Sequence, residues 1–156
     1  MIALLRVDDR LIHGQVVLGW GAAIKPDRIV LADDEVAASE WERSIYAEGW
    51  PDVRISIASL EDAARQLAGG VFDRERIILL LRNPRGVIAL MDLGIPVTEV
   101  NIGGLHFREG REKLVDGVYI DADERAALRE LVKRGVTLDG RAVSRSEKAT
   151  LNSLVV

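Results

Sequence analysis

The sequence predicts an α/β fold, in which an open, mainly parallel β-sheet is covered by helices on both faces. Three observations lead to this prediction. Short apolar runs typical of buried strands alternate with segments whose apolar residues recur at helical spacing. Gly, Pro, Asn and Asp stand at the junctions between the two kinds of segment. No internal repeat or linker interrupts the alternation, and such alternation is typical of a parallel sheet with helical connections.

The chain opens with an apolar run at 2–5 that predicts a buried strand. The charged residues at 6–13 predict an exposed loop, because a cluster of charges would be costly in a core. Apolar side chains at helical spacing predict the first helix over 14–23. The run 28–32 predicts the second strand, and the acidic residues at 33–35 begin an amphipathic helix.

The middle of the chain contains the most apolar segment. Alternating apolar and polar residues at 53–57 predict a half-buried strand, and Ser59 caps a helix that ends at Gly69-Gly70. The run 77–81 is the most hydrophobic and predicts a central strand. Asn83-Pro84 then supplies a cap and a first-turn proline for the next helix.

The last third continues the same pattern. Its expected strands are 97–102, 118–120 and 136–138. We expect Gly103-Gly104 to end the first of these strands in a backbone turn. Asp121 is placed to cap a helix, and a final helix is expected from Ser144, with Glu147 as its capping partner. Together these elements predict a Rossmann-like three-layer sandwich in a single domain, residues 1–156.

Composition narrows the functional class. A net charge of -4 and a pI near 5.3 argue against nucleic-acid binding. The chain has no cysteine, which excludes a disulfide framework and a thiolate metal site. No apolar run approaches the roughly 18 residues of a membrane span, and the N-terminus has no signal-peptide pattern. We therefore expect a cytoplasmic protein.

Ligands of open parallel sheets bind beyond the carboxyl ends of the strands. Four polar loops are expected at that edge, and they are 8–13, 33–35, 82–85 and 103–106. The strands themselves are apolar, so the polar residues gather in these loops. We expect the functional site on this rim.

His13 is the candidate nucleophile of the rim. It is expected at the first turn of a helix, where free N–H groups and the helix dipole favour an anion. Arg10 and Arg6 supply positive donors for a phosphoryl group, and Asp8 or Asp9 could select the reactive tautomer of the ring. If His13 is considered without its neighbours, an equally good interpretation is an ordinary loop histidine that is hydrogen-bonded to one of these aspartates.

The segment Arg6-Val7-Asp8-Asp9-Arg10-Leu11-Ile12-His13-Gly14-Gln15-Val16 resembles the active-site signature of the IIB component of mannose/fructose/sorbose-type sugar phosphotransferase systems. The segments 33–37, 83–84 and 100–110 support the resemblance by their order and spacing. The resemblance implies an open, mainly parallel sheet. It also implies that His13 accepts a phosphoryl group from a IIA phosphohistidine and passes it to a sugar, with Arg10 binding the phosphate.

The resemblance further implies a protein-Npi-phosphohistidine–sugar phosphotransferase (EC 2.7.1.-) without metal or organic cofactor. The donor would be a separate IIA protein, and the sugar would be bound by the membrane components IIC and IID, which could hold the chain at the inner face of the membrane. The expected supporting residues are Arg6, Asp8, Asp9, Gly14 and Gln15. The expected docking rim is Asp34, Asn83, Arg85, Gly103 and Gly104. A homo-oligomer is left open.

Two alternatives remain at the level of function: a regulatory phosphocarrier without transport, and a nucleotide-binding α/β domain. The glycine pair 103–104 lacks the Gly-x-Gly-x-x-Gly pattern, so the nucleotide signal is weak. The acidic residues 33–35 could bind Mg²⁺, but a helix cap explains them better. For His106 we favour a rim residue hydrogen-bonded to a neighbour over a second phosphate carrier.

Overall fold

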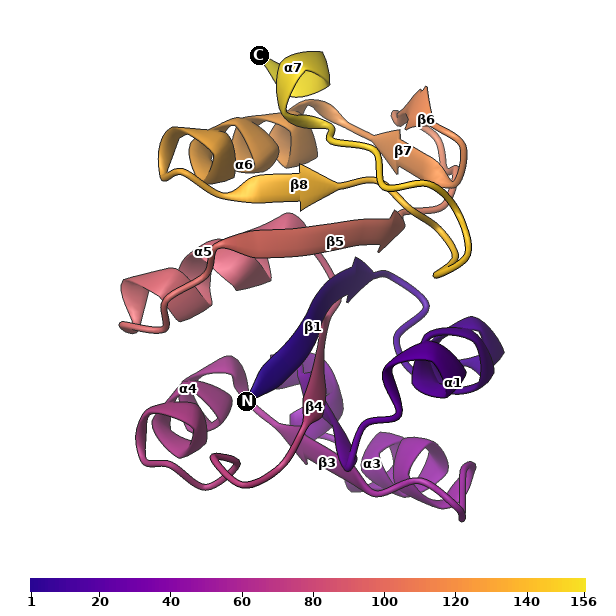
Figure 1. The fold of residues 1–156 in the computed structure, drawn as a ribbon, viewed down its shortest axis with the longest axis vertical. Coiled ribbons are helices and arrows are strands. Elements are labelled where there is room, and N and C mark those ends of the chain that lie inside the picture. Colours follow the sequence, from indigo (N-terminus) through magenta and orange to yellow (C-terminus); the bar gives the residue numbers. More distant parts are fainter.

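The computed structural model describes residues 1–156 and contains a six-stranded sheet. The strands are β1 (Ile2–Asp8), β2 (Arg28–Ala32), β3 (Ile55–Ala58), β4 (Ile77–Leu81), β5 (Glu99–Gly104) and β8 (Thr137–Asp139). Their order is β3-β2-β4-β1-β5-β8, and all neighbours pair in parallel. The predicted fold class is therefore confirmed (Figure 1).

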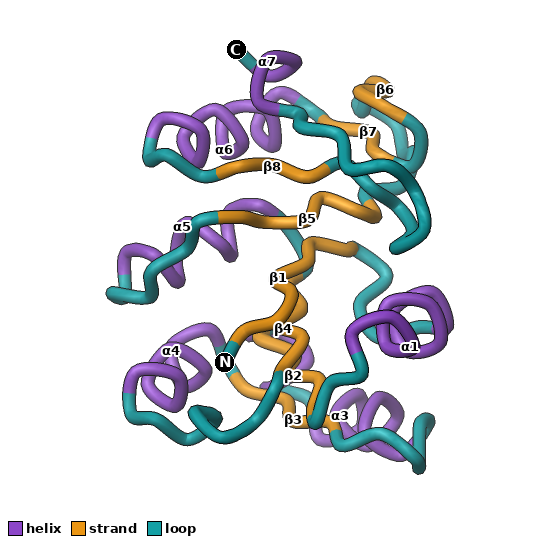
Figure 2. Tube along the Cα trace, in the orientation of Figure 1, coloured by secondary structure: helices purple, strands orange, loops and turns teal.

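Helices cover both faces of this sheet. The helical segments are η1 (Gln15–Trp20, a π-helix), α1 (Gly21–Ile24), α2 (Asp34–Ala37), α3 (Glu40–Glu48), α4 (Leu60–Ala68), α5 (Pro84–Asp92), α6 (Ala122–Lys133) and α7 (Asn152–Val155). Figure 2 shows the strands between a layer with α4, α5 and α6 and a layer with α1 and α3. Each layer encloses its own apolar cluster against the sheet. None of the helices has the length and apolar character needed to cross a membrane.

The order of the strands explains where the site lies. β4 is fully buried over its whole length and lies between β2 and β1, so the prediction of a central strand is confirmed. Because β2, β4, β1 and β5 are neighbours and parallel, the loops after them meet at one edge of the sheet. Asp33 caps α2 and Asn83 caps α5 at this edge, as their positions in the sequence predict.

The first strand is longer than expected. Residues 6–13 were expected to form an exposed loop, but Arg6 and Asp8 belong to β1 and are fully buried. The expectation was wrong because these charges neutralise each other. Nη2 of Arg6 lies 3.0 Å from Oδ2 of Asp8, and Nη1 donates to Oδ1 of Asn101. A paired and hydrogen-bonded charge can be buried at far lower cost than an isolated one.

The glycine pair does not form the expected turn. Gly103 and Gly104 continue β5, and both are buried. A Cβ at Gly103 would overlap the guanidinium of Arg6, and one at Gly104 would lie 2.5 Å from the carboxylate of Asp8. Glycine is required here because the polar side chains of β1 lie directly against the backbone of β5.

The C-terminal third differs most from expectation. β7 (Val118–Ile120) does not lie in the main sheet but pairs with β6 (Glu112–Val115) in a separate antiparallel hairpin. The sequence did not predict β6. The prediction of a helix from Ser144 is also wrong, because turns and irregular backbone occupy 140–149 and α7 begins only at Asn152. Directly after these residues, Thr150 forms an isolated antiparallel bridge with Asp139 of β8.

Candidate functional site

His13 lies between the end of β1 and the start of η1, and its side chain is 19% exposed. Its Nε2 is 2.9 Å from Oδ2 of Asp8, and the backbone N–H of Gln15 donates to its Nδ1 at 3.3 Å. A carboxylate only accepts hydrogen bonds, so Nε2 carries the proton. Nδ1 is therefore left with its lone pair at the beginning of a helical segment.

Asp8 organises the groups around this ring. Its Oδ2 also accepts from Nη2 of Arg6, and its Oδ1 accepts from the backbone N–H of Arg10 at 3.0 Å. Burial by itself would raise the pKa of Asp8, but the hydrogen bonds from His13 and Arg10 and the charge of Arg6 outweigh burial and lower it. Asp8 is thus a stable anion beneath the imidazole.

Arg6 supports Asp8 from inside the fold. Its Nη1 donates to Oδ1 of Asn101 at 2.6 Å, and its guanidinium lies 5.6 Å from the centre of the Trp20 ring. Burial lowers the pKa of Arg6, and the neighbouring charge of Asp8 partly restores it. Because Arg6 is fully buried, it can hold Asp8 in place but cannot contact a phosphoryl group on the surface.

Arg10 is the cation that reaches the surface beside His13. Its side chain is 44% exposed, and its Nε lies 3.6 Å from Oδ1 of Asp8. Its Nη2 donates to Oε1 of Gln15 at 2.6 Å, so Gln15 contacts both Arg10 and the imidazole. Gly14 separates His13 from Gln15 and has no atom within 4 Å of the position a Cβ would take. Nδ1 is the ring atom available for covalent chemistry here, with a guanidinium close by.

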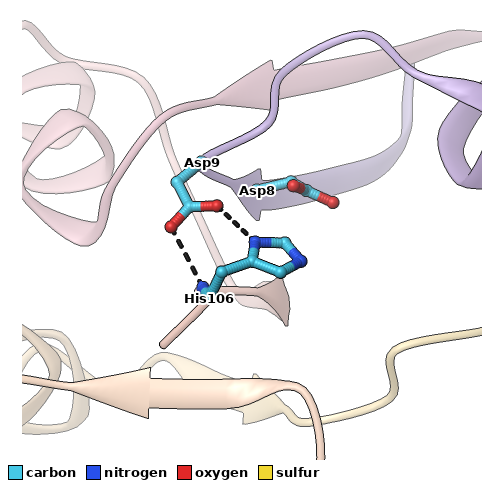
Figure 3. Close-up of side chains that lie close together, drawn as sticks. All are labelled: Asp8, Asp9 and His106. Carbon is cyan, nitrogen blue, oxygen red and sulfur yellow. Dashed lines mark hydrogen bonds and ion pairs between the residues drawn. The ribbon is translucent and has the colours of Figure 1, made fainter. Parts of the chain in front are cut away.

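A second pair of residues, Asp9 and His106, lies next to the first. Oδ1 of Asp9 is 2.6 Å from Nδ1 of His106, and Oδ2 accepts from the backbone N–H of His106 at 3.0 Å (Figure 3). The expectation that His106 bonds a neighbour is therefore confirmed. Asp8, Asp9 and His106 offer donor atoms within 4.8 Å of one another. Both carboxylates already accept from guanidinium groups, which disfavours a cation there.

Sequence reasoning missed Arg111, which connects three parts of the site. Its Nη1 donates to Oδ2 of Asp9 at 2.8 Å and to the carbonyl oxygen of His106 at 2.6 Å. Its Nε and Nη2 donate to both carboxylate oxygens of Glu124 on α6. Burial disfavours the charge of Arg111, yet these carboxylates raise its pKa above the usual value. No local pattern distinguishes this buried arginine from the exposed Arg108.

The residues expected on the docking rim differ in their exposure. Asp34 and Arg85 are exposed, and the side chain of Arg85 is 71% exposed, 3.9 Å from Asp123. Asn83 is partly buried because it caps α5. Gly103 and Gly104 are buried in β5, so the structure corrects their assignment to the docking rim. A polar cavity of about 360 Å³, lined in part by Arg85 and Asp9, opens on this rim.

Comparisons with known proteins agree with this geometry. The family model described as PTS system sorbose subfamily IIB component matches residues 2–156. The sorbose-specific EIIB component of Lacticaseibacillus casei is 37% identical over 144 residues, which cover 92% of this chain and 88% of that protein. The mannose-specific EIIAB component of Escherichia coli K12 is 33% identical over 156 residues, covering 99% of this chain and 48% of that protein.

Solved structures give the same result. The crystal structure of the IIBSor domain of the sorbose permease from Klebsiella pneumoniae aligns with a TM-score of 0.90 and 32% identity, covering 99% of this chain and 96% of that one. The crystal structure of the N-acetylgalactosamine-specific IIB component 1 from Escherichia coli aligns with a TM-score of 0.84 and 32% identity, covering 95% of this chain and 97% of that one. The similarity therefore extends over the whole sheet and both helical layers.

Proposed function

The chain belongs to the sorbose subfamily of IIB components of sugar phosphotransferase systems, which are phosphocarriers in sugar uptake. We propose that Nδ1 of His13 carries the phosphoryl group. The observation that carries the proposal is the opposite environment of the two ring nitrogens. Nε2 donates to buried Asp8, whereas Nδ1 is unprotonated and its lone pair accepts only the 3.3 Å hydrogen bond from the backbone N–H of Gln15. Nδ1 is therefore the nucleophile.

In the first half-reaction, Nδ1 of His13 forms an N–P bond while the N–P bond of the donor phosphohistidine breaks. The ring becomes positive, and the carboxylate of Asp8 at 2.9 Å stabilises that charge. Arg10 binds the phosphoryl oxygens, since it is the exposed guanidinium beside the ring. The backbone N–H of Gln15 donates to Nδ1 before transfer, and once the N–P bond has formed it can donate instead to a phosphoryl oxygen, together with the N–H of Gly14 where the helical segment begins.

The chain is a phosphotransferase by its family. We assign it the finer activity of a protein-Npi-phosphohistidine–sugar phosphotransferase, with residues 1–156 acting as one IIB unit. Its donor is a IIA protein, and its acceptor is a sugar held by IIC and IID at the inner face of the membrane. The name of the Escherichia coli relative, an EIIAB component, supports a IIA donor.

The test is phosphorylation of the full chain by the general phosphotransferase proteins and a IIA protein, followed by mass spectrometry. We expect one acid-labile, base-stable phosphate on His13. His13→Gln should take up no phosphate, whereas the control His106→Gln should still be labelled. Phosphate uptake by His13→Gln at the wild-type rate would contradict the assignment. A chain that is labelled on His13 but passes phosphate to no sugar would favour the regulatory alternative.

A further inference from the structure

The two imidazoles of the chain are held in complementary ways by adjacent carboxylates. Asp8 binds Nε2 of His13 at 2.9 Å, and Asp9 binds Nδ1 of His106 at 2.6 Å. A ring nitrogen of His106 also lies within 4.8 Å of a carboxylate oxygen of Asp8, so the two Asp–His pairs are neighbours. Because the carboxylates bind opposite nitrogens, the unprotonated nitrogen is Nδ1 in His13, where it accepts only from the backbone N–H of Gln15, and Nε2 in His106.

The two half-reactions of a phosphocarrier differ in their proton balance. Between two imidazoles, one N–P bond breaks and another forms, and no proton has to leave. In transfer to a sugar, the hydroxyl oxygen forms the new O–P bond and the N–P bond of His13 breaks, returning its electron pair to Nδ1. The hydroxyl proton is then left over and needs a base.

Few groups on the rim can take that proton. Asp8 and Asp9 are weak bases, because the guanidinium groups of Arg6 and Arg111 and their other hydrogen bonds stabilise the anions and lower the pKa of both carboxyls. Nδ1 of His106 faces the carboxylate of Asp9 and therefore carries a proton, which leaves the lone pair on Nε2. Figure 3 shows Nε2 pointing away from Asp9, and the side chain is 42% exposed.

We propose that Nε2 of His106 is the general base that accepts the proton of the sugar hydroxyl when phospho-His13 transfers its phosphoryl group. The proposal rests on the proposed function of His13. Asp9 stabilises the imidazolium ion formed on His106, because its carboxylate oxygen already lies 2.6 Å from Nδ1. Arg111 fixes the position of Asp9 relative to His106, because its Nη1 donates both to Oδ2 of Asp9 and to the carbonyl oxygen of His106. The proton then passes to solvent from the exposed ring.

The experiment separates the two half-reactions. His106→Asn retains a hydrogen-bond donor near Asp9 but has no Nε2, and His106→Ala lacks both. Each variant is phosphorylated with radiolabelled IIA, and the labelled chain is then mixed with membrane vesicles containing IIC and IID and with sorbose, mannose, fructose or N-acetylgalactosamine. Glu109→Gln, an exposed change in the same loop, is the control.

Both His106 variants should accept phosphate at close to the wild-type rate. Transfer to sugar should fall by about 100-fold or more, the usual contribution of a general base. Added imidazole should partly restore transfer by His106→Ala, which a purely structural role does not predict. Wild-type rates of sugar transfer in both variants, or an equal loss in both half-reactions, would overturn the proposal. A wild-type chain that takes up no phosphate on His13 would instead overturn the proposed function.

Discussion

His13 and Arg6 bind the same oxygen atom, Oδ2 of Asp8, at 2.9 and 3.0 Å. Arg6 is fully buried beneath the site, whereas His13 reaches its surface. The carboxylate therefore serves the stability of the fold and the chemistry of the ring at once. A change at Asp8 should affect both properties.

Replacing Asp8 with Asn tests this coupling. Removing one partner of a buried ion pair costs about 3–5 kcal/mol, since the charge of Arg6 is left without a counter-ion. Asp8→Asn should lower the free energy of unfolding by an amount in that range and slow phosphorylation of the folded fraction. Urea unfolding and phosphate uptake measure the two effects. Asp116→Asn, an exposed change, is the control, and equal stability of both variants would contradict the coupling.

Arg10→Ala should affect chemistry without affecting the fold. Its guanidinium is partly exposed and contacts Asp8 only at 3.6 Å. Loss of one donor to a transferring group typically reduces the rate by about 10²–10³. Phosphate uptake and return to IIA should both slow, and Arg10→Lys should recover part of the rate because it keeps the charge. An unchanged rate, together with unchanged thermal stability, would remove Arg10 from the site.

The order of elements and the position of the site could be predicted because both follow from local patterns. The apolar run of β4 and the cap formed by Asn83 are visible within a few residues. The parallel order then places the loops of β1 and β5 at one edge. His13 was found because its neighbours in sequence are also its neighbours in space.

The burial of the charges could not be predicted in the same way. Arg6 is stabilised by Asn101, 95 residues away, and Asp9 by Arg111, 102 residues away. A pattern within one segment cannot reveal such partners, so a cluster of charges was interpreted as an exposed loop. The same limit explains why Gly103 and Gly104 were expected to form a turn, since the need for glycine at these positions comes from side chains of another strand.

Gly104→Ala tests the close packing between β1 and β5. The new Cβ would lie 2.5 Å from the carboxylate of Asp8, so either the carboxylate or the strand must move. Overpacking of this kind usually costs about 1–3 kcal/mol, and phosphorylation of His13 should slow as well. The matched control is Gly19→Ala, because no atom lies within 4 Å of that Cβ. Wild-type stability and activity of Gly104→Ala would show that the contact is unimportant.

Acid should destabilise the chain through Asp8 and Asp9. Burial alone would raise the pKa of each carboxyl, but hydrogen bonds and charges, from His13 and Arg6 for Asp8 and from Arg111 for Asp9, lower both pKa values. The unfolded chain therefore binds more protons. Stability should be complete above the usual aspartate pKa of about 3.9 and decrease as the pH falls through the lower folded values. Urea midpoints that stay constant down to about pH 3 would contradict this.

Arg85→Glu tests whether the rim that holds His13 is also the docking surface. If His13 carries the phosphoryl group as proposed, both partners must reach this rim, and a shallow rim lets both approach. Arg85 is exposed beside the polar cavity and has only a distant partner in Asp123, so its charge is available to steer an encounter. Reversing the charge should slow phosphorylation by IIA at low salt and reduce its salt dependence. The control is Arg54→Glu, an exposed change just before β3 at the opposite edge. If both variants match the wild type at every salt concentration, Arg85 lies outside the docking surface.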